Sequence, residues 1–282
     1  MSSDDSLVAI IRCQTVRSDG SGVRVEHVVV EEPLEIRIRR GSEERPLAVT
    51  MRTPGSDREL AAGFLWGEGI IRRADQLLTV GVSDDRLLSE RERANVVIVS
   101  LSPEAAEVAR NLERRFTVSS ACGVCGSTSL SSLHDRGIER VALTPHDAPT
   151  LAGMTALLDG RQEIFARTGG LHAAALVDPS GALSYVREDV GRHNAVDKIV
   201  GAALFAGGLP LSGWTLVVSG RVGYEIAQKA VAAGMSALVG VSAPTSLSVE
   251  VAREFGLTLL AFARGGVANQ YSPEVALDSP RR

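Results

Sequence analysis

The sequence predicts an α/β protein in which a three-layer C-terminal domain follows a smaller α+β part. Apolar runs of strand length at 215–219, 237–241 and 257–263 alternate with segments of helical periodicity. Strands that alternate with helices form parallel βαβ units with right-handed crossovers. Before them, two strand-like segments flank the turn 178–181, where proline fixes φ and glycine accepts a positive φ. This hairpin adds an antiparallel element to the predicted sheet.

The first half mixes β-branched or alternating segments with one clear helix. Asp57 is a suitable N-cap for this helix, and Gly67 and Gly69 are suitable residues to end it. A second, shorter helix follows a strand-like run. The predicted elements are strands at 23–30, 34–38, 46–51 and 96–101, and helices at 57–69 and 103–112.

The second half is more regular, and its helices are amphipathic or buried. Residues 114–129 are rich in Ser, Thr and Gly without periodicity, which predicts a loop. The predicted elements after it are helices at 151–166, 193–205, 224–233 and 246–255, with strands at 172–177 and 183–187 beside those above. We therefore expect an N-terminal domain over 1–113, a cysteine-bearing loop and connector over 114–149, and the three-layer domain over 150–282.

Composition places the chain among globular cytoplasmic proteins. Its 282 residues are 44% hydrophobic and 23% charged, with a net charge of −4, which argues against general nucleic-acid binding. No segment has the length of a membrane-spanning helix, and the N-terminus lacks the pattern of a signal peptide. Three cysteines do not form a secreted disulfide framework. In a reducing cytoplasm, a C-x-x-C motif is more often catalytic or metal-binding.

The sharpest local feature is Cys122-Gly-Val-Cys125 in the predicted loop. Thiols at this spacing can lower one pKa and exchange sulfur, because the thiolate is the nucleophile. Three other readings remain open: half of a zinc site, a thioredoxin-like redox pair, and inert loop cysteines. A zinc site needs two more ligands, and the sequence offers no second C-x-x-C and no paired histidines.

Further candidate residues cluster where predicted strands end. His172 follows two glycines, Arg192 and His193 lie between a strand and a helix, and Arg221 and Arg264 each follow a buried strand. In open α/β sheets, ligands bind beyond the carboxyl ends of the strands. Arginines and exposed backbone N–H groups suit phosphate, and Asp189 could accept from a sugar or a base. Each motif alone is equally well explained as a cap or a turn, but together they predict an anionic, nucleotide-like ligand.

The chain resembles the FdhD family of formate dehydrogenase accessory proteins. The P-loop and the Rossmann G-x-G-x-x-G are absent from the sequence. The resemblance is carried instead by segments in the family's order, with looser matches over the first 110 residues at Met51-Arg-Thr-Pro-Gly and Glu59-Leu-Ala-Ala-Gly-Phe-Leu. The main segments are Ala-Cys122-Gly-Val-Cys125-Gly, Thr-Gly-Gly-Leu-His172, Glu-Asp189-Val-Gly-Arg-His193-Asn, Ser-Gly-Arg221, Ala-Pro244-Thr-Ser-Leu and Phe-Ala-Arg264.

This resemblance implies a cytidine-deaminase-like fold for the second domain and a role as a sulfurtransferase. In that role the chain accepts sulfur from a cysteine desulfurase as a persulfide. It passes the sulfur to the bis-molybdopterin guanine dinucleotide molybdenum cofactor before that cofactor enters formate dehydrogenase. Cys122 corresponds to the persulfide carrier and Cys125 to its partner. GDP-like nucleotides are expected to mimic the client. The implied cofactor-binding stretch comprises Phe262, Ala263, Arg264, Gly265, Gly266 and Val267.

The chain departs from the family pattern at one place, and two other functions compete with this scheme. Gly265-Gly266 stands where relatives often carry polar or basic residues, so side-chain contacts there are in doubt. A molybdenum-cofactor chaperone without sulfur chemistry would use the same pocket and tolerate cysteine substitution. A zinc deaminase on this fold would need H-x-E before P-C-x-x-C, and no such element precedes Cys122. The resemblance also implies a homodimer.

Overall fold

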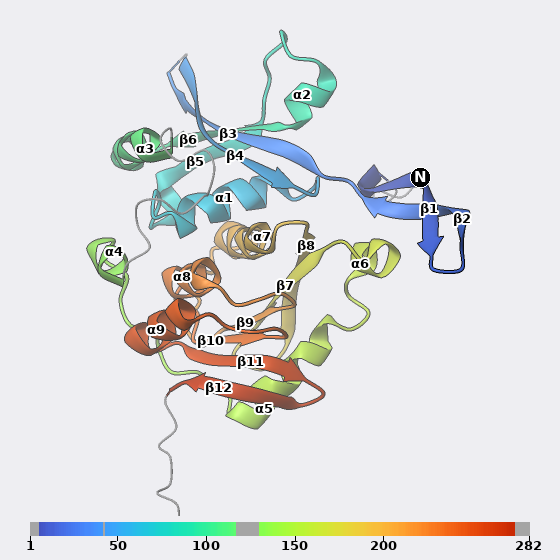
Figure 1. Cartoon of the computed structure of the whole chain (residues 1–282). Coiled ribbons are helices and arrows are strands. Elements are labelled where there is room, and N and C mark those ends of the chain that lie inside the picture. The colour runs from blue at the N-terminus through green and yellow to red at the C-terminus, as the bar shows by residue number, and fades with distance from the viewer. Residues whose placement is uncertain (1–5, 42, 117–129, 274–282) are drawn as a thin grey trace, which may run out of the picture.

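The computed structural model describes residues 6–41, 43–116 and 130–273 (Figure 1). The first half holds β1 (Val8–Arg17), β2 (Gly20–Val29), β3 (Glu32–Arg40), β4 (Glu43–Arg52), α1 (Asp57–Gly67), η2 (Ala74–Gln76), β5 (Leu77–Val82), α2 (Glu90–Ala94), β6 (Val96–Leu101) and α3 (Pro103–Phe116). The second half holds α4 (Leu130–Asp135), α5 (Ala148–Gly153), η3 (Met154–Leu158), α6 (Glu163–Thr168), β7 (His172–Val177), β8 (Leu183–Asp189), α7 (Arg192–Phe205), β9 (Thr215–Val218), α8 (Tyr224–Ala232), β10 (Ala237–Gly240), α9 (Ser246–Phe255), β11 (Thr258–Arg264) and β12 (Val267–Ser272).

A six-stranded sheet in the order β12-β11-β10-β9-β7-β8 organises the second half. Strands β9, β10 and β11 are parallel, whereas β7 runs antiparallel to both of its neighbours and β12 runs antiparallel to β11. Apart from Thr215, Thr258 and Arg264, the residues of the parallel strands are apolar or glycine, as expected where both faces of a sheet are covered. Helices α7, α8 and α9 cover one face, and α5 and η3 cover the other (Figure 1).

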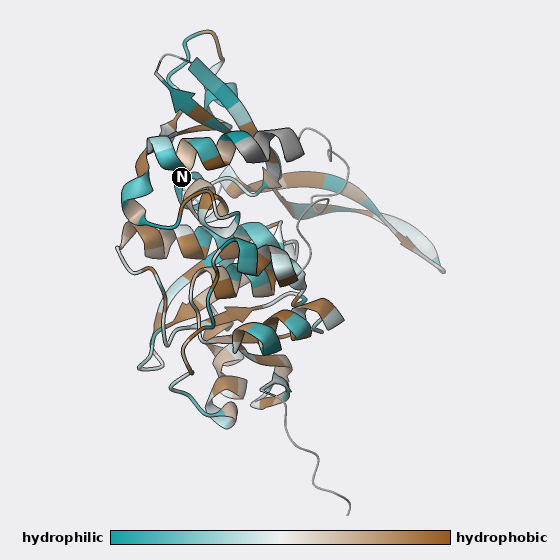
Figure 2. Ribbon diagram, turned by 90° about the vertical axis from the view of Figure 1, so that its left-hand side faces the viewer, coloured by the Kyte–Doolittle hydropathy of each residue, from teal (hydrophilic) through white to brown (hydrophobic). Residues whose placement is uncertain are grey.

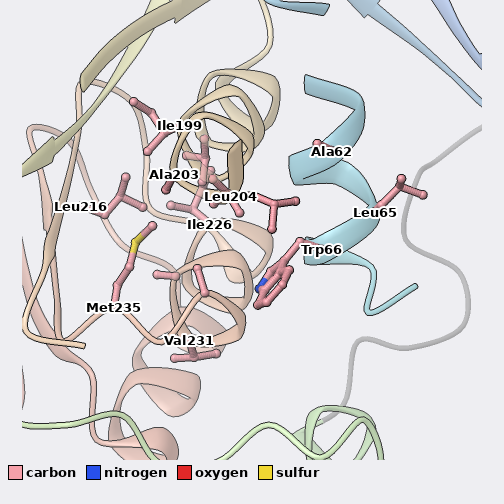
Figure 3. Close-up of a cluster of buried hydrophobic side chains, with 14 of the residues drawn as sticks. Ala62, Leu65, Trp66, Ile199, Ala203, Leu204, Leu216, Ile226, Val231 and Met235 are labelled. Atoms are coloured by element: carbon pink, nitrogen blue, oxygen red, sulfur yellow. The ribbon is translucent and has the colours of Figure 1, made fainter. Parts of the chain in front are cut away.

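The first half contains a four-stranded sheet in the order β4-β3-β6-β5, with α1 packed against it. Helix α1 packs on its other side against α7 and α8, so one hydrophobic core runs through both halves. Figure 3 shows Trp66 of α1 beside Leu204 of α7 and the α8 side chains Ile226 and Val231. The Trp66 indole N–H donates to the carbonyl of Ala232 at 2.8 Å.

Two glycines allow α1 and α7 to cross at very short range. A β-carbon added at Gly63 would lie 1.9 Å from the carbonyl oxygen of Asp197, and one added at Gly201 would lie 1.9 Å from that of Glu59. Only hydrogen fits at either position. The carboxylate of Glu59 also accepts two hydrogen bonds from Arg187 on β8, at 2.6 and 2.7 Å. These contacts fix the N-terminal sheet against the second half.

The predicted mixed α/β class is confirmed, and the likeness of the second half to cytidine deaminases stays a prediction. Three expectations were wrong in detail. The helix expected over 151–166 is three short pieces, because Gly160 adopts a positive φ of 69° between η3 and α6. Strand β11 does not end the sheet, since β12 follows it. Strands β1 and β5 were missed. Among the described residues, no helix is long and apolar enough to cross a membrane.

Candidate pocket at the strand ends

A pocket of about 840 Å³ opens at one edge of the six-stranded sheet. The carboxyl ends of β9, β10 and β11 meet there with the start of β7, because β7 is antiparallel to β9. The opposite wall comes from α5, η3 and α6. The lining residues are Gly153, Thr155, Ala156, Leu158, Asp159, Gln162, Phe165, Gly169, Gly170, Leu171, His172, Ser219, Val241, Ala263, Arg264, Gly265 and Gly266.

Part of the predicted binding stretch lines this pocket together with His172. Ala263 is buried beneath it, while Arg264 and the two following glycines are exposed at its rim. The two ends of the stretch, Phe262 and Val267, are not among the lining residues. Both side chains are exposed, and the amide of Phe262 donates to the carbonyl of Ser242 at 3.1 Å.

The Gly265-Gly266 pair has a local structural cause. Arg264 pairs with Val267, and the two glycines between them have φ values of 57° and 77°. Two consecutive positive φ values define the type I′ turn, which matches the twist of a β-hairpin. Phe262 also has a positive φ of 54°, beside a register shift between Ala261 and Arg264. A non-glycine residue in this conformation is uncommon. The turn therefore explains the glycines without a ligand, although it also leaves their backbone accessible from the pocket.

A second group of predicted residues surrounds His172 on the side toward α7. A β-carbon at Gly220 would lie 3.2 Å from Nδ1 of His172 and 3.6 Å from Cβ of Arg192, so these residues pack closely and a side chain at position 220 would require the imidazole to shift slightly. Burial lowers the pKa of His172, and the positive charges of Arg192, His193 and Arg221 lower it further. The imidazole is thereby favoured in its neutral form. Arg192, His193 and Arg221 do not themselves line the pocket.

His193 is oriented by an acidic neighbour on α8. Its Nδ1 lies 2.8 Å from Oε2 of Glu225. Burial alone would raise the pKa of Glu225, but the hydrogen bond and charge of His193 lower it overall. The carboxylate therefore fixes the ring of His193. The Nε atom of Arg192 is buried without a hydrogen-bond partner in the described structure.

Asp189, expected to accept from a sugar or base, is instead fully buried and structural. Its carboxylate accepts hydrogen bonds from the amide of Gly191 at 2.8 Å and from Nδ2 of Asn194 at 3.0 Å. It also pairs with the ammonium of Lys198 at 2.7 Å, and Lys198 donates to the carbonyl of Thr53 at 3.0 Å. Asp189 thus holds the start of α7 against the N-terminal half.

Sequence reasoning missed the α5–α6 wall of the pocket. Thr155, Asp159, Gln162 and Phe165 all line it. At 3.6 residues per turn, these four positions would lie within about 120° of one another on a continuous helix over 151–166, so they would share one side of that helix as well. The spacing of these positions on one helical face is the signal that could have found them. The Asp159-Gly160 step is a turn signal that could have located the break between η3 and α6.

The pocket suits a ligand with an apolar or aromatic body and an anionic group. Its volume falls within the range of about 300–1,000 Å³ that is typical of small-molecule sites. Leu158, Leu171 and Phe165 offer apolar surface, whereas Arg264 offers a guanidinium fork that matches phosphate. Among the described residues, no group of three or more His, Cys, Asp or Glu side chains could hold a metal ion.

The predicted catalytic pair lies outside the described residues. Cys122 and Cys125 belong to the segment 117–129. The segment is bounded by α3, which packs against β4 and β6, and by α4, which contacts α9. The ring of His134 on α4 stacks on Phe255 of α9 with centroids 4.8 Å apart. Cys13 is a free, partly exposed thiol on β1.

Comparison with known proteins gives consistent matches across nearly the whole chain. Sulfur carrier protein FdhD of Streptomyces avermitilis is 45% identical over 262 residues, which cover 92% of each chain. The protein of that name from Mycobacterium tuberculosis is 43% identical over 268 residues, 93% of this chain and 95% of that protein. A crystal structure of a candidate formate dehydrogenase accessory protein from Desulfotalea psychrophila superposes with a TM-score of 0.73 at 22% identity, covering 95% of this chain and 98% of that one. That structure supports the fold alone.

The sequence profile of the FdhD/NarQ family matches residues 29–277. This range contains the pocket, the cluster around His172 and the cysteine pair. The chain therefore belongs to the FdhD/NarQ family.

Proposed function

We propose that this chain is a sulfur carrier that serves formate dehydrogenase. The observation that carries the proposal is its 45% identity to a protein named sulfur carrier protein over 92% of both chains. The pocket at the strand ends supports it, because a carrier must recognise the molecule that receives its sulfur. The reducing cytoplasm, where thiols persist, is the compartment that suits this chemistry.

Cys122 is the proposed carrier of the sulfur. Its thiolate attacks the terminal sulfur of a persulfide on a cysteine desulfurase, so that the S–S bond of the desulfurase breaks as a new one forms on Cys122. The desulfurase leaves as a thiolate. One thiolate and one persulfide enter, and one thiolate and one persulfide leave, so this step needs no oxidant or reductant.

Delivery of sulfide uses the second thiol. The thiolate of Cys125 attacks the inner sulfur of the Cys122 persulfide, which forms a Cys122–Cys125 disulfide and releases the outer sulfur as hydrosulfide. The cysteine pair supplies the two electrons that reduce this sulfur. The hydrosulfide becomes a ligand of the molybdenum in the client. A dithiol reductant must then reduce the disulfide before another cycle.

The proposed client is the bis-molybdopterin guanine dinucleotide molybdenum cofactor, which this chain handles as substrate. One guanine nucleotide arm would occupy the pocket of about 840 Å³, with a phosphate on Arg264 and the backbone of Gly265 and Gly266. The half-exposed ring of Phe262 offers a stacking surface next to this rim, and Ala263 and Val267 flank it. The second group, His172, Arg192, His193 and Arg221, would meet a further anionic part of the same molecule.

The sulfur-carrier proposal is tested by the activity of formate dehydrogenase produced with cysteine variants of this chain. Cys122→Ala and Cys125→Ala should each fold as the wild type does, and Cys122→Ala should abolish activation of the dehydrogenase. Cys13→Ala is the matched control and should activate fully. If Cys122→Ala activates the enzyme as well as the wild type, the chain is a cofactor chaperone without sulfur chemistry, and the sulfur-carrier proposal fails.

A further inference from the structure

Two arginines approach each other at the edge of the fold that lies opposite the pocket. Arg72 follows the end of α1, and Arg136 directly follows α4. Nε2 of His134 on α4 lies 2.9 Å from Oε1 of Glu254 in the last turn of α9. Since α9 runs from the carboxyl end of β10 to the start of the parallel strand β11, this turn lies at the edge opposite the pocket. The sheet between the two edges is largely hydrophobic (Figure 2), and neither arginine lines the pocket.

The turn after α1 brings these two side chains together. Gly69 has a positive φ of 71°, and its amide donates to the carbonyl of Trp66 at 2.9 Å. A β-carbon at Gly69 would lie 2.8 Å from Nη2 of Arg72 and 3.7 Å from Cδ of Arg136. Both arginines therefore pack against the same backbone position. The glycine supplies the turn and also leaves room for the guanidinium of Arg72.

The described surroundings of Arg72 do not balance its positive charge. The residue is half-buried, and among the described residues only its backbone amide is bonded, to Oε1 of Gln76 at 2.6 Å. Burial lowers the pKa of Arg72, and the charge of Arg136 lowers it further. The next arginine differs, because Arg73 is exposed and pairs with Asp75 and Glu104. A half-buried guanidinium beside a second cation favours the binding of an anion.

We propose that Arg72 and Arg136 form a binding site for a small oxyanion with two negative charges, of the class of sulfate. The planar guanidinium of Arg72 would donate two parallel hydrogen bonds to two oxygens of the anion, as arginine does to tetrahedral oxyanions in general. Arg136 would supply the second positive charge, so that a dianion balances the pair. Chloride offers neither the second charge nor the paired oxygens, and it should therefore bind more weakly.

An anion held by both arginines would connect α1 with α4 (Figure 1). Arg72 belongs to the turn after α1, whereas Arg136 belongs to the turn after α4, and the two helices are 62 residues apart in the sequence at Gly67 and Leu130, with the segment 117–129 between them. A ligand that binds only the folded chain raises its stability. Sulfate should therefore raise the Tm of the protein. This effect does not depend on whether the chain carries sulfur.

Calorimetric titration of the full chain with sodium sulfate tests the site, with sodium chloride keeping the ionic strength constant. All proteins carry Arg264→Ala, which removes the arginine of the pocket and leaves the site at the opposite edge intact. This background protein should bind sulfate saturably. Adding Arg72→Met or Arg136→Gln should each raise the dissociation constant for sulfate about ten-fold or more, because a hydrogen-bonded charge is lost. Adding Arg73→Met is the matched control and should leave the constant unchanged.

Thermal unfolding in chloride alone separates anion binding from a purely structural role of Arg72. Because no described acceptor balances this charge and Arg136 repels it, Arg72→Met should unfold at the same or a higher temperature than the background protein. It should nevertheless lose the rise in Tm that sulfate causes, whereas Arg73→Met should keep that rise. The proposal is overturned if the background protein does not bind sulfate, if Arg72→Met binds it as tightly, if Arg73→Met loses binding to the same extent, or if Arg72→Met lowers the Tm in chloride.

Discussion

Substitution Gly63→Ala tests whether the crossing of α1 and α7 holds the two halves of the chain together. The new β-carbon would lie 1.9 Å from the carbonyl oxygen of Asp197, and real β-carbons essentially never approach another heavy atom within 3.0 Å. The helices must therefore separate by at least 1.1 Å, the difference between these two distances. A gap of about 0.5–1 Å already forfeits a quarter to a half of the dispersion energy of each affected contact. The obstacle is backbone, so no side chain can move aside.

The magnitude follows from two opposing contributions. Overpacking a close-packed core costs about 1–3 kcal/mol, and a clash with backbone places Gly63→Ala at the upper end. Alanine gains about 1 kcal/mol over glycine in a helix interior. The net loss in the free energy of unfolding is about 2 kcal/mol, which corresponds to a fall in Tm of roughly 4–8 °C for a domain of this order of size.

Thermal and urea unfolding measure this loss against a matched control. Gly153→Ala is also a helical glycine substitution, with φ −75° and ψ −19°, but no atom lies within 4 Å of the added β-carbon. It should be neutral or slightly stabilising. If Gly63→Ala is as stable as Gly153→Ala, the two helices do not cross at the distance described, and the shared core is wrongly assigned.

Three further predictions concern the pocket and the buried charges. Arg264→Ala should weaken GDP binding about ten-fold in calorimetry, whereas Arg86→Ala, an exposed arginine outside the pocket lining, should not change it. Because the pKa of His172 is lowered in the free protein and a bound phosphate would raise it, GDP affinity should increase as pH falls toward 6, and His172→Gln should remove this dependence. A flat pH profile in the wild type would contradict the placement of His172. In the wild type, the ammonium of Lys229 lies 2.7 Å from the buried carboxylate of Asp197. Lys229→Met leaves this carboxylate without its partner. It should cost about 3–5 kcal/mol in urea unfolding, and adding Asp197→Leu should recover most of that loss.

The strands and helices of the second half were predicted correctly where their burial and their local capping residues indicate the same element. Strands β9 and β10 are short and buried throughout, and apart from Thr215 their residues are apolar or glycine, which is typical of a central strand. Helix α9 is capped at its start by Thr245, whose hydroxyl accepts from the amide of Ser248 at 3.3 Å, and at its end by Gly256 with φ 75°. Caps of this kind are visible in the residues themselves.

Edges and breaks were harder to predict. Strand β12 is an edge strand of mixed polarity that pairs with β11 alone in the described sheet, so it has neither an apolar run nor a clean alternation. Gly160 interrupts a segment whose periodicity favours one helix. In both cases tertiary contacts determine the local structure, and the local sequence pattern carries little information about those contacts.

The residues of the candidate site, like the elements of the fold, could be predicted only in part from the sequence. His172 and Arg264 were both predicted to bind the ligand, and both line the pocket: Arg264 lies at the carboxyl end of β11, where the strand-end rule expects a ligand, and His172 lies at the start of β7. Arg192 and His193 lie at the start of α7, after β8, and Arg221 follows β9, and all three lie beside His172 without lining the pocket. The wall that contains Phe165 was not predicted from the sequence, and its contribution emerged only from the structure.

The most direct test of sulfur transfer is the intact mass of the protein after incubation with a cysteine desulfurase and cysteine. The wild type should gain one sulfur mass that a thiol reductant removes, and Cys122→Ala should gain none, because its carrier thiolate is absent. Cys13→Ala should behave as the wild type. A wild-type protein that gains no sulfur, or a Cys122→Ala variant that gains as much, would contradict the assignment of Cys122 as the carrier.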